Sequence, residues 1–391
     1  MRKFIVAAIM LVGTLATAHE RPLTVVNVSG WLPVSCDSDI VATSGNIRLT
    51  LPAAPATDGC DIVLINGDSG AGKYLIGFPA DINPKLYPNQ AVGITSLSGQ
   101  WLSKSKPGRY IITPSTSIIY VDNNGDDTND GISLPLQHFS AVNKVIKQDI
   151  DLAGLTPIIA PSINQTFTND PLILDGPYAG GYLVQVTPNG NGKFTWGGTD
   201  SCVLVRDGAW VDLRLNQFIS GGPITQPNGS IDFRCNTSNT PMSGHIYVHN
   251  NAGFDLEGIP TFYGAGNEDN AIFFDGSTYG AAIADGILVD GRFDSAFRMD
   301  EGGGRFNWGG TIPYNGSVVS IAAASPSAVL NRIYMVLGNS ELLLGACPAS
   351  SGYASVGPSI IGGNGLLIAH NCTIPGSYAQ QQNGKVYADK G

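Results

Sequence analysis

Only one segment of the mature chain has the period of an amphipathic helix, and this constrains the fold more than any other feature. Pro135 suits a first helical turn, and apolar side chains then recur at three- and four-residue steps at Phe139, Val142, Val145, Ile146 and Ile150. About 240 residues of strands and turns follow. Because stacked β-structures expose an aggregation-prone end, we expect the helix, at about residues 135–149, to cap the first coil.

The residues after this helix read as stacked strand–turn units. Short apolar alternations that end in Gly, Asn or Asp recur at irregular intervals of about 20 to 35 residues, the length of one solenoid coil with variable loops. They include SCVLVRDGAWVDLRLNQF, SIDFRCN, GHIYVHNNAGFDLEG, NAIFFDG, GILVDGRFDSAFRMD and GLLIAHNC. A flat β-sandwich is the alternative architecture, but it would leave the single helix without a role.

The residues before the helix predict a separate small β-domain. Segments such as NIRLTLP, CDIVLING and AVGITSLSGQW are separated by Gly, Pro, Asn and Asp clusters, as in a small sandwich or barrel. With 50 Gly, 24 Pro and only 13% charged residues, the composition also favours an all-β protein. We place this domain at residues 19–113 and the stacked structure at residues 114–391.

The N-terminal residues 1–18 have the order of a secretory signal peptide. Arg2 and Lys3 precede an apolar run that ends in small residues at Ala18. That run is shorter than the ~20 residues that a membrane span needs, so we expect cleavage after Ala18, no membrane span afterwards, and a secreted chain. Export permits disulfides, and the six cysteines fall into three sequential pairs: Cys36 with Cys60, Cys202 with Cys235, and Cys347 with Cys372.

Two motifs suggest ligands that their context argues against. GDSGAGKY, at Gly67 to Tyr74, matches most of a phosphate-binding loop, but Tyr74 replaces the required hydroxyl and no amphipathic helix follows, so we do not expect a nucleotide. VDNNGDDTNDGIS fails as an EF-hand calcium loop, because Asp127 stands at its sixth position and Ser133 at its twelfth.

The acidic stretch before the helix leaves two interpretations open. Asp, Asn and Gly supply turn geometry, so the stretch can be the hinge that leads from an entry strand into the helix. A looser calcium site formed by Asp122, Asp126 and Asp130 is the alternative, and no other cofactor is expected.

At this point the chain resembles a known family. The YVDNNGDDTNDGISLP segment, the helix and the Gly- and Asn-rich strands are similar to the entrance of right-handed parallel β-helix proteins of the pectate-lyase-like superfamily, which includes many phage tailspikes and tail fibres. The likeness covers Ile119 to about Gly391. LYPNQAVGITSLSGQWLSKSKPGRYIIT is similar to modules that precede β-helices in phage and prophage structural proteins. The resemblance implies a right-handed parallel β-helix with a capping helix.

Period-two alternation places two sets of polar side chains on the outer surface of these strands. In GILVDGRFDSAFRMD the outward set contains Asp290, Asp294, Arg298 and Asp300. These residues predict either a catalytic polysaccharide cleft, with paired carboxylates or calcium carboxylates beside an Arg as in pectate lyases, or a solvated ladder of ion pairs.

The second outward set predicts sugar binding. In GHIYVHN it contains His245, Tyr247 and His249, and in AWVDLRL it contains Trp210 beside Asp212 and Arg214. Aromatic faces stack on sugar rings, whereas cross-strand packing is the structural alternative.

Charge and motifs leave two functional classes. The net charge of −10, with 21 basic and 31 acidic residues, gives no footprint for nucleic acid. The first class is a phage- or prophage-type adhesion protein that binds a cell-surface polysaccharide. The second is a secreted polysaccharide lyase or glycoside hydrolase. We favour the first, because an acidic chain cannot easily build the positive cleft that a pectate-type lyase needs. The apolar segment Ser317–Leu330 further predicts a shared face in a homotrimer.

Overall fold

The computed structural model shows an all-β protein that divides into two compact units, residues 1–108 and 109–391. It describes residues 21–389, apart from 69–70, 106–107, 216–218, 220–230, 236–243, 250–251, 259, 266–268, 276–280, 284–285, 301–304, 309–319, 345–348, 352–356 and 371–376. The expected signal peptide at residues 1–18 therefore lies outside the described residues. The boundary falls five residues before the one placed at residue 113 from the sequence.

Within its described residues, the first unit forms two sheets around one hydrophobic core. The five-stranded sheet has the order β1 (Leu23–Val26), β3 (Ser38–Ala42), β5 (Asp61–Asn66), β8 (Ala91–Leu97), β9 (Gln100–Ser105). The four-stranded sheet has the order β2 (Gly30–Trp31), β4 (Arg48–Thr50), β6 (Lys73–Ile76), β7 (Lys85–Leu86). Buried side chains from both sheets, such as Ile40 and Leu49, share the core.

The path of the chain through this unit differs from a succession of hairpins. Strands β1 to β6 alternate between the two sheets, and each of β1 to β4 pairs in parallel with the strand two steps later. Only the later pairs β5–β8, β6–β7 and β8–β9 are antiparallel. Turn spacing in the sequence could not reveal this, because parallel and antiparallel strands end in the same turn residues.

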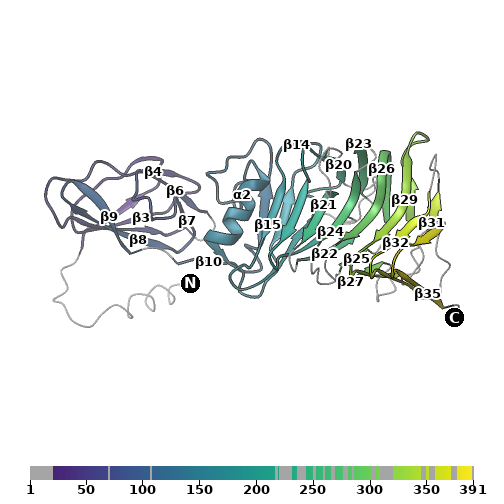
Figure 1. Ribbon diagram of the computed structural model, residues 1–391. Helices are drawn as coiled ribbons and strands as arrows, with labels where there is room; N and C mark the ends of the chain where they lie inside the picture. The colour runs from purple at the N-terminus through teal and green to yellow at the C-terminus, as the bar shows by residue number, and fades with distance from the viewer. Residues whose placement is uncertain are drawn as a thin grey trace. The chain divides into compact units, whose positions relative to one another are not determined.

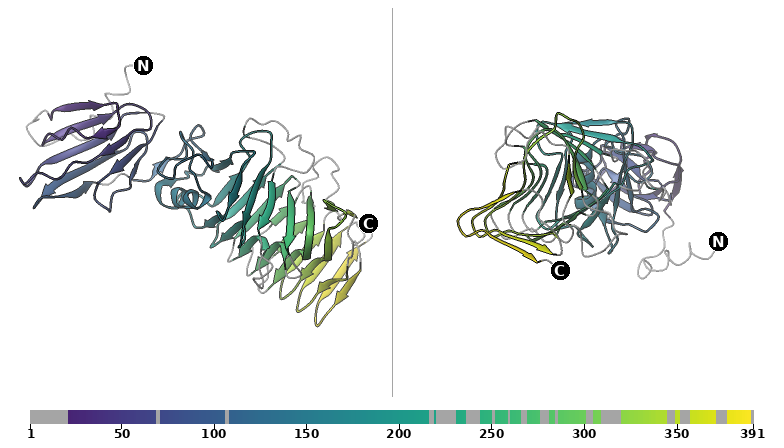
Figure 2. Two further views of the ribbon diagram at one scale, coloured as in Figure 1. Left: turned by 90° about the horizontal axis from the view of Figure 1, so that it is seen from above. Right: turned by 90° about the vertical axis from the view of Figure 1, so that its right-hand side faces the viewer.

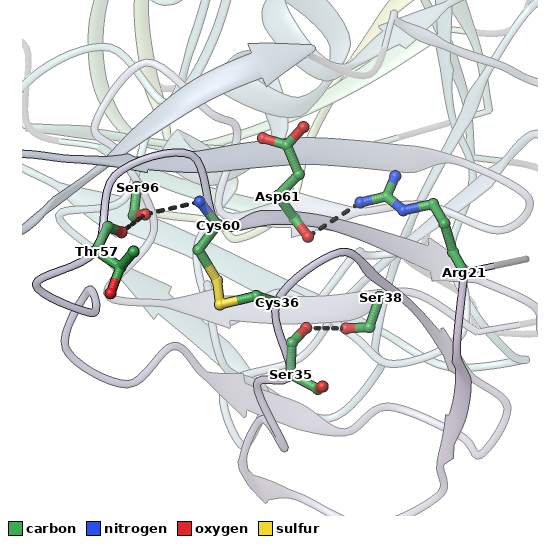
Figure 3. Close-up of a disulfide and its surroundings, with 8 residues drawn as sticks. All are labelled: Arg21, Ser35, Cys36, Ser38, Thr57, Cys60, Asp61 and Ser96. Carbon is green, nitrogen blue, oxygen red and sulfur yellow. Dashed lines mark hydrogen bonds between the residues drawn. A yellow bond between two sulfur atoms is a disulfide. The ribbon is translucent and has the colours of Figure 1, made fainter. Parts of the chain in front are cut away.

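The disulfide Cys36–Cys60 joins the chain just before two adjacent parallel strands, β3 and β5 (Figure 3). The backbone N–H of Cys60 donates to the Ser96 hydroxyl over 3.0 Å, and that hydroxyl donates to the Thr57 carbonyl over 2.7 Å. The Arg21 guanidinium donates to the Asp61 carbonyl over 3.0 Å. The bond and its neighbours thus hold the start of the sheet in register.

The motif that resembles a phosphate-binding loop belongs to the core of this unit. Lys73 begins strand β6 and is only 2% exposed. Its ammonium donates to the carbonyls of Gly45 and Ala71, over 2.7 and 3.0 Å, and lies 3.4 Å from the Asp68 carboxylate. The lysine side chain is therefore engaged by the protein itself.

The second unit contains two long sheets whose strands stack along its length (Figures 1 and 2). The ten-stranded sheet has the order β11 (Ile118–Val121), β13 (Ile158–Pro161), β16 (Leu183–Val186), β19 (Trp210–Arg214), β22 (Gly253–Glu257), β25 (Ala281–Ile283), β27 (Arg305–Trp308), β30 (Glu341–Leu344), β33 (Leu366–His370), β35 (Lys385–Asp389). Two short strands, β10 (Tyr110–Ile111) and β12 (Ile150–Asp151), form a separate two-stranded parallel sheet.

The fourteen-stranded sheet has two columns of strands, which the long strand β26 (Gly286–Asp300) joins because it belongs to both. One column contains β14 (Thr166–Thr168), β17 (Phe194–Gly198), β20 (Ile231–Cys235), β23 (Thr261–Ala265), β28 (Ser320–Ala323) and β31 (Ala349–Ser351). The other contains β15 (Leu172–Asp175), β18 (Val203–Arg206), β21 (Gly244–His249), β24 (Asn270–Asp275), β29 (Val329–Val336), β32 (Ser359–Ile361) and β34 (Tyr378–Gln380).

The chain visits these sheets in a repeating order. One strand lies in the ten-stranded sheet, the next two lie in the fourteen-stranded sheet, and the chain then returns to the first. Each strand pairs in parallel and in register with its counterpart one coil later, as β16 does with β19 and β15 with β18. This topology confirms the predicted long parallel sheets and is compatible with the β-helix that the resemblance implies.

In-register stacking builds the core from columns of like side chains. Phe167, Trp196, Phe233 and Phe262 occupy equivalent positions on four successive coils, and each is at most 1% exposed. The rings of Phe233 and Phe262 are stacked with centroids 4.7 Å apart and 9° between their planes. The ring of Trp196 lies 5.8 Å from that of Phe233.

The helix starts later than the sequence predicted. Helix α2 spans Phe139–Lys144 and continues as a π-helical turn, η1 (Val145–Asp149). Residue 135 cannot begin it, because the next residue, Leu136, is held in a backbone bridge to Val121. The predicted apolar stripe is buried, and Phe139 packs against Phe167 and Trp196 of the first coils. Figure 1 shows α2 beside β15, at the first end of the stack.

A second disulfide, Cys202–Cys235, joins the residue just before β18 to the last residue of β20, so it links two strands of the fourteen-stranded sheet. The sequential pair Cys347 and Cys372 lies outside the described residues. None of the helices in the described part of the chain is both long enough and apolar enough to cross a membrane.

The segment expected to form a trimer face is described only in part. Of Ser317–Leu330, the described side chains of Ile321, Ala328 and Leu330 are fully buried. Exposed positions in the same segment belong to the turn around Pro326. The described part of the segment therefore gives no support for an intersubunit surface, because the chain itself covers Ile321, Ala328 and Leu330.

The aromatic column generates a stability prediction. Phe233→Ala should lower the free energy of unfolding by about 3–5 kcal/mol, because it leaves a cavity between two stacked rings. Thr168→Ala, on the exposed surface of the same column of strands, is the control and should change it by less than about 0.5 kcal/mol. Urea denaturation of the full chain measures both. A loss below about 1 kcal/mol for Phe233→Ala would show that the column does not carry the core.

Candidate functional site

The charged row on β26 consists of side chains that already have partners. Asp290 accepts a hydrogen bond from the Ser325 hydroxyl. Asp294 pairs with Arg332 over 2.7 Å, and Arg298 pairs with Asp300 over 2.9 Å. Asp290 lies where β26 pairs with β23, whereas Arg298 and Asp300 lie where β26 pairs with β24. This is the arrangement of an ion-pair ladder that runs across two columns of strands.

An aromatic stack extends this ladder to the preceding coils. The Tyr247 ring packs against those of His249 and Phe273, with ring centroids 4.8 and 5.1 Å away and nearly parallel planes. Its hydroxyl donates to Asp275 over 3.0 Å, and Arg298 lies 5.5 Å from the Phe273 ring. Burial and the bond to Asp275 raise the pKa of Tyr247. Its ring faces are taken up by protein, which leaves little aromatic surface for a sugar.

The predicted outward orientation of His245 is wrong. Its side chain and that of Asp269 are fully buried, with Nε2 of the histidine 3.1 Å from the carboxylate. The rings of Phe262 and Phe293 pack against it. His245 is the second residue of β21, where three successive residues, 244–246, are all buried and the alternation of inward and outward positions does not hold.

A different surface forms around Trp210 on the ten-stranded sheet. Trp210 begins β19 and is paired in register with Gly253, the first residue of β22 on the next coil. A Cβ atom on Gly253 would lie 2.3 Å from Cδ2 of the indole, so the ring lies directly over this glycine. The indole N–H donates to the Asp255 carboxylate over 2.9 Å. Because Gly253 has no side chain, the Trp210 ring can lie flat on the sheet.

Charged residues continue the two strands beyond this ring. Asp212 and Asp255 are register neighbours on adjacent coils, as are Arg214 and Glu257. The Arg214 Nε donates to Asp212 Oδ2 over 2.7 Å and lies 3.9 Å from Glu257 Oε1. Asp212 Oδ1 is buried without a hydrogen-bond partner among the described residues. The surface therefore combines an aromatic ring, a guanidinium that is already hydrogen-bonded to Asp212, and a carboxylate oxygen that lacks a hydrogen-bond donor.

The electrostatics single out Asp212. It is 5% exposed, and burial raises its pKa; Arg214 lowers the pKa in part, and Asp255 raises it again.

The Tyr182 ring lies 6.2 Å from the Trp210 ring and is 58% exposed. We name the surface formed by Tyr182, Trp210, Asp212, Arg214, Asp255 and Glu257 the Trp210 platform. It can stack a flat apolar face and accept hydrogen bonds at its rim.

The acidic stretch before α2 uses its carboxylates to hold the backbone. Asp122 accepts from the N–H of Asn124, Asp126 from that of Thr128, and Asp130 from those of residues 132, 133 and 134. Across the described residues, no three His, Cys, Asp or Glu side chains are grouped so that they could hold a metal ion. The bonds are those of successive Asx turns, which shape the hinge.

Neighbouring carboxylates complete the hinge and begin the helix. Asp127 accepts from the N–H groups of Gln137 and His138 and pairs with the His138 ring over 2.7 Å, which raises the histidine pKa. Asp170, from the first full coil, accepts from the N–H of Phe139 and of Ser140. A carboxylate distant in sequence thus caps the free N–H groups at the start of α2.

Trp210 was identified from the sequence, but the glycine and the two acidic residues that complete its surroundings were not. A signal for them exists. Residues 202–214, CVLVRDGAWVDLR, and residues 245–257, HIYVHNNAGFDLE, share an Ala-X-apolar-Asp-Leu core, with Trp in the first and Gly in the second. The structure stacks these two segments in register. A search for repeats would have paired the residues.

The chain shows no significant match to a protein-family model, to a curated protein or to a solved structure. The functional argument therefore depends on the geometry of the site.

The contact between Trp210 and Gly253 can be tested directly. Gly253→Ala should displace the indole and break its bond to Asp255, so that its N–H exchanges with solvent at least about fivefold faster, since a hydrogen bond contributes about 1 kcal/mol. NMR measures this on the indole resonance that Trp210→Phe removes. Gly197→Ala is the control, because its Cβ would meet nothing closer than 4.0 Å. Unchanged exchange in Gly253→Ala would contradict the flat placement of the ring.

Asp212 generates a pH prediction. The pKa of Asp212 is raised in the folded state, so the charged carboxylate lowers the stability of the folded protein. This loss of stability grows as pH rises from the ordinary Asp range through the folded pKa. Asp212→Asn keeps an acceptor for Arg214 and removes the cost. The variant should be at least as stable as wild type at neutral pH, and its advantage should vanish as pH falls below the unfolded pKa of about 3.9. Thermal melting across pH tests this, and a large loss of stability at neutral pH would refute it.

Proposed function

We propose that this chain is a right-handed parallel β-helix protein of phage or prophage tail-spike or tail-fibre type, which binds a cell-surface polysaccharide through the Trp210 platform. The single observation that carries the proposal is the indole of Trp210 lying flat over Gly253 with carboxylates at its edge. Sugar rings present an apolar face and a rim of hydroxyls, and such a surface is complementary to both.

The rest of the molecule suits a binding scaffold. Parallel strands paired in register over many coils give a rigid support, and a site built on strands holds its geometry better than one on loops. The row Asp290, Asp294, Arg298 and Asp300 acts in this proposal as a structural ladder, because its members pair with one another or with the next coil. Secretion or incorporation into a virion, and assembly as a homotrimer, remain parts of the proposal that sedimentation and localisation experiments address.

A secreted glycoside hydrolase or polysaccharide lyase is the second candidate, and one observation favours it. Asp212 and Asp255 stand on adjacent coils in different environments, one buried with a raised pKa and the other hydrogen-bonded to an indole. Carboxylates whose environments separate their pKa values can divide the roles of acid and base. Release of shorter oligosaccharides that Asp212→Asn abolishes would favour this enzyme over the adhesion protein.

The proposed binding is tested with a glycan array followed by calorimetry on any glycan retained. Trp210→Ala should weaken binding at least about tenfold, equivalent to about 1.4 kcal/mol, because it removes the stacking surface. Tyr387→Ala is the matched control, since Tyr387 is a 56% exposed aromatic residue on the last coil of the same sheet. It should leave affinity unchanged. Equal affinity of Trp210→Ala and wild type would refute this site.

A further inference from the structure

The charges of the Trp210 platform restrict the class of glycan that it can take. Asp212, Asp255 and Glu257 contribute three carboxyl groups, against the one guanidinium of Arg214. That guanidinium already donates to Asp212 and lies near Glu257. A glycan carboxylate placed here would meet like charges, with no uncommitted cation to receive it. Polyuronates are therefore poor ligands for this surface.

The same surface offers two attractions to a positive charge. The orphaned Oδ1 of Asp212 is buried and needs a hydrogen-bond donor, because a buried acceptor left unpaired costs about 1–3 kcal/mol. Trp210 stands two residues before Asp212 on the same strand, β19, and the face of a Trp ring attracts an ammonium group. An ammonium donor would satisfy the carboxylate with a charge-assisted bond and contact the ring at once.

We infer that the Trp210 platform selects a glycan that carries free amino sugars, with the sugar ring stacked on Trp210 and its ammonium group on Asp212. This inference rests on the proposed function and specifies its ligand. Neutral sugars can share the stacking interaction, but they lack the charge that the carboxylates favour. The preference over a neutral analogue should therefore depend on Asp212, whereas binding of both should depend on Trp210.

The experiment compares three tetrasaccharides by calorimetry at mildly acidic pH on the full mature chain. A glucosamine tetramer should bind at least about tenfold more tightly than its fully N-acetylated counterpart, and tetragalacturonate should bind most weakly. Asp212→Asn should abolish the preference for the amine. Asp207→Asn is the matched control, because it removes an exposed carboxylate from the same coil at a positive φ that Asn also tolerates.

The outcomes separate this inference from the proposed function. If the N-acetylated tetramer or the galacturonate binds as tightly as the amine, and Trp210→Ala weakens binding, the inference is refuted and the glycan site stands. If Trp210→Ala changes no binding, the site itself is refuted. If Asp207→Asn removes the amine preference as fully as Asp212→Asn does, the general negative charge of the chain explains the preference, and the inference is again refuted.

Discussion

Parallel pairing in register is the constraint on which the second unit depends. Each strand aligns residue by residue with the strand one coil later, so every side chain has a counterpart directly above and below it. Inside the stack this produces continuous columns such as Phe167, Trp196, Phe233 and Phe262. Outside it, the same alignment brings charges and rings from distant parts of the sequence within contact of one another.

The Trp210 platform is a consequence of that alignment. An indole on one coil can lie flat only if the counterpart position on the next coil leaves space, and Gly253 leaves it. The same register places Asp212 beside Asp255 and Arg214 beside Glu257. On the fourteen-stranded sheet, by contrast, the β26 charges find opposite charges or hydroxyls. A buried acceptor without a donor, as at Asp212, is unfavourable for folding alone, and together with the indole lying over Gly253 it is why we place the site there.

The hinge before the helix shows the other use of acidic residues in this chain. Its Asp side chains accept hydrogen bonds from backbone N–H groups that turns and helix ends leave unsatisfied. The first coil contributes Asp170 to the start of α2, and α2 covers the first coil with Phe139. Helix and stack thus depend on each other, since the cap of the helix comes from the structure that it covers.

The sequence by itself determined the all-β class, the amphipathic helix and the inward side chains of most strands. These features follow from local periodicity, which short segments carry whatever surrounds them. The helix start, the burial of His245 and the surroundings of Trp210 were decided by tertiary structure. Leu136 is drawn into a bridge with Val121, and His245 lies in a run of three buried residues where the alternation fails. Gly253 becomes meaningful only when register sets it beneath an indole, because register is a relation between coils that no single segment contains.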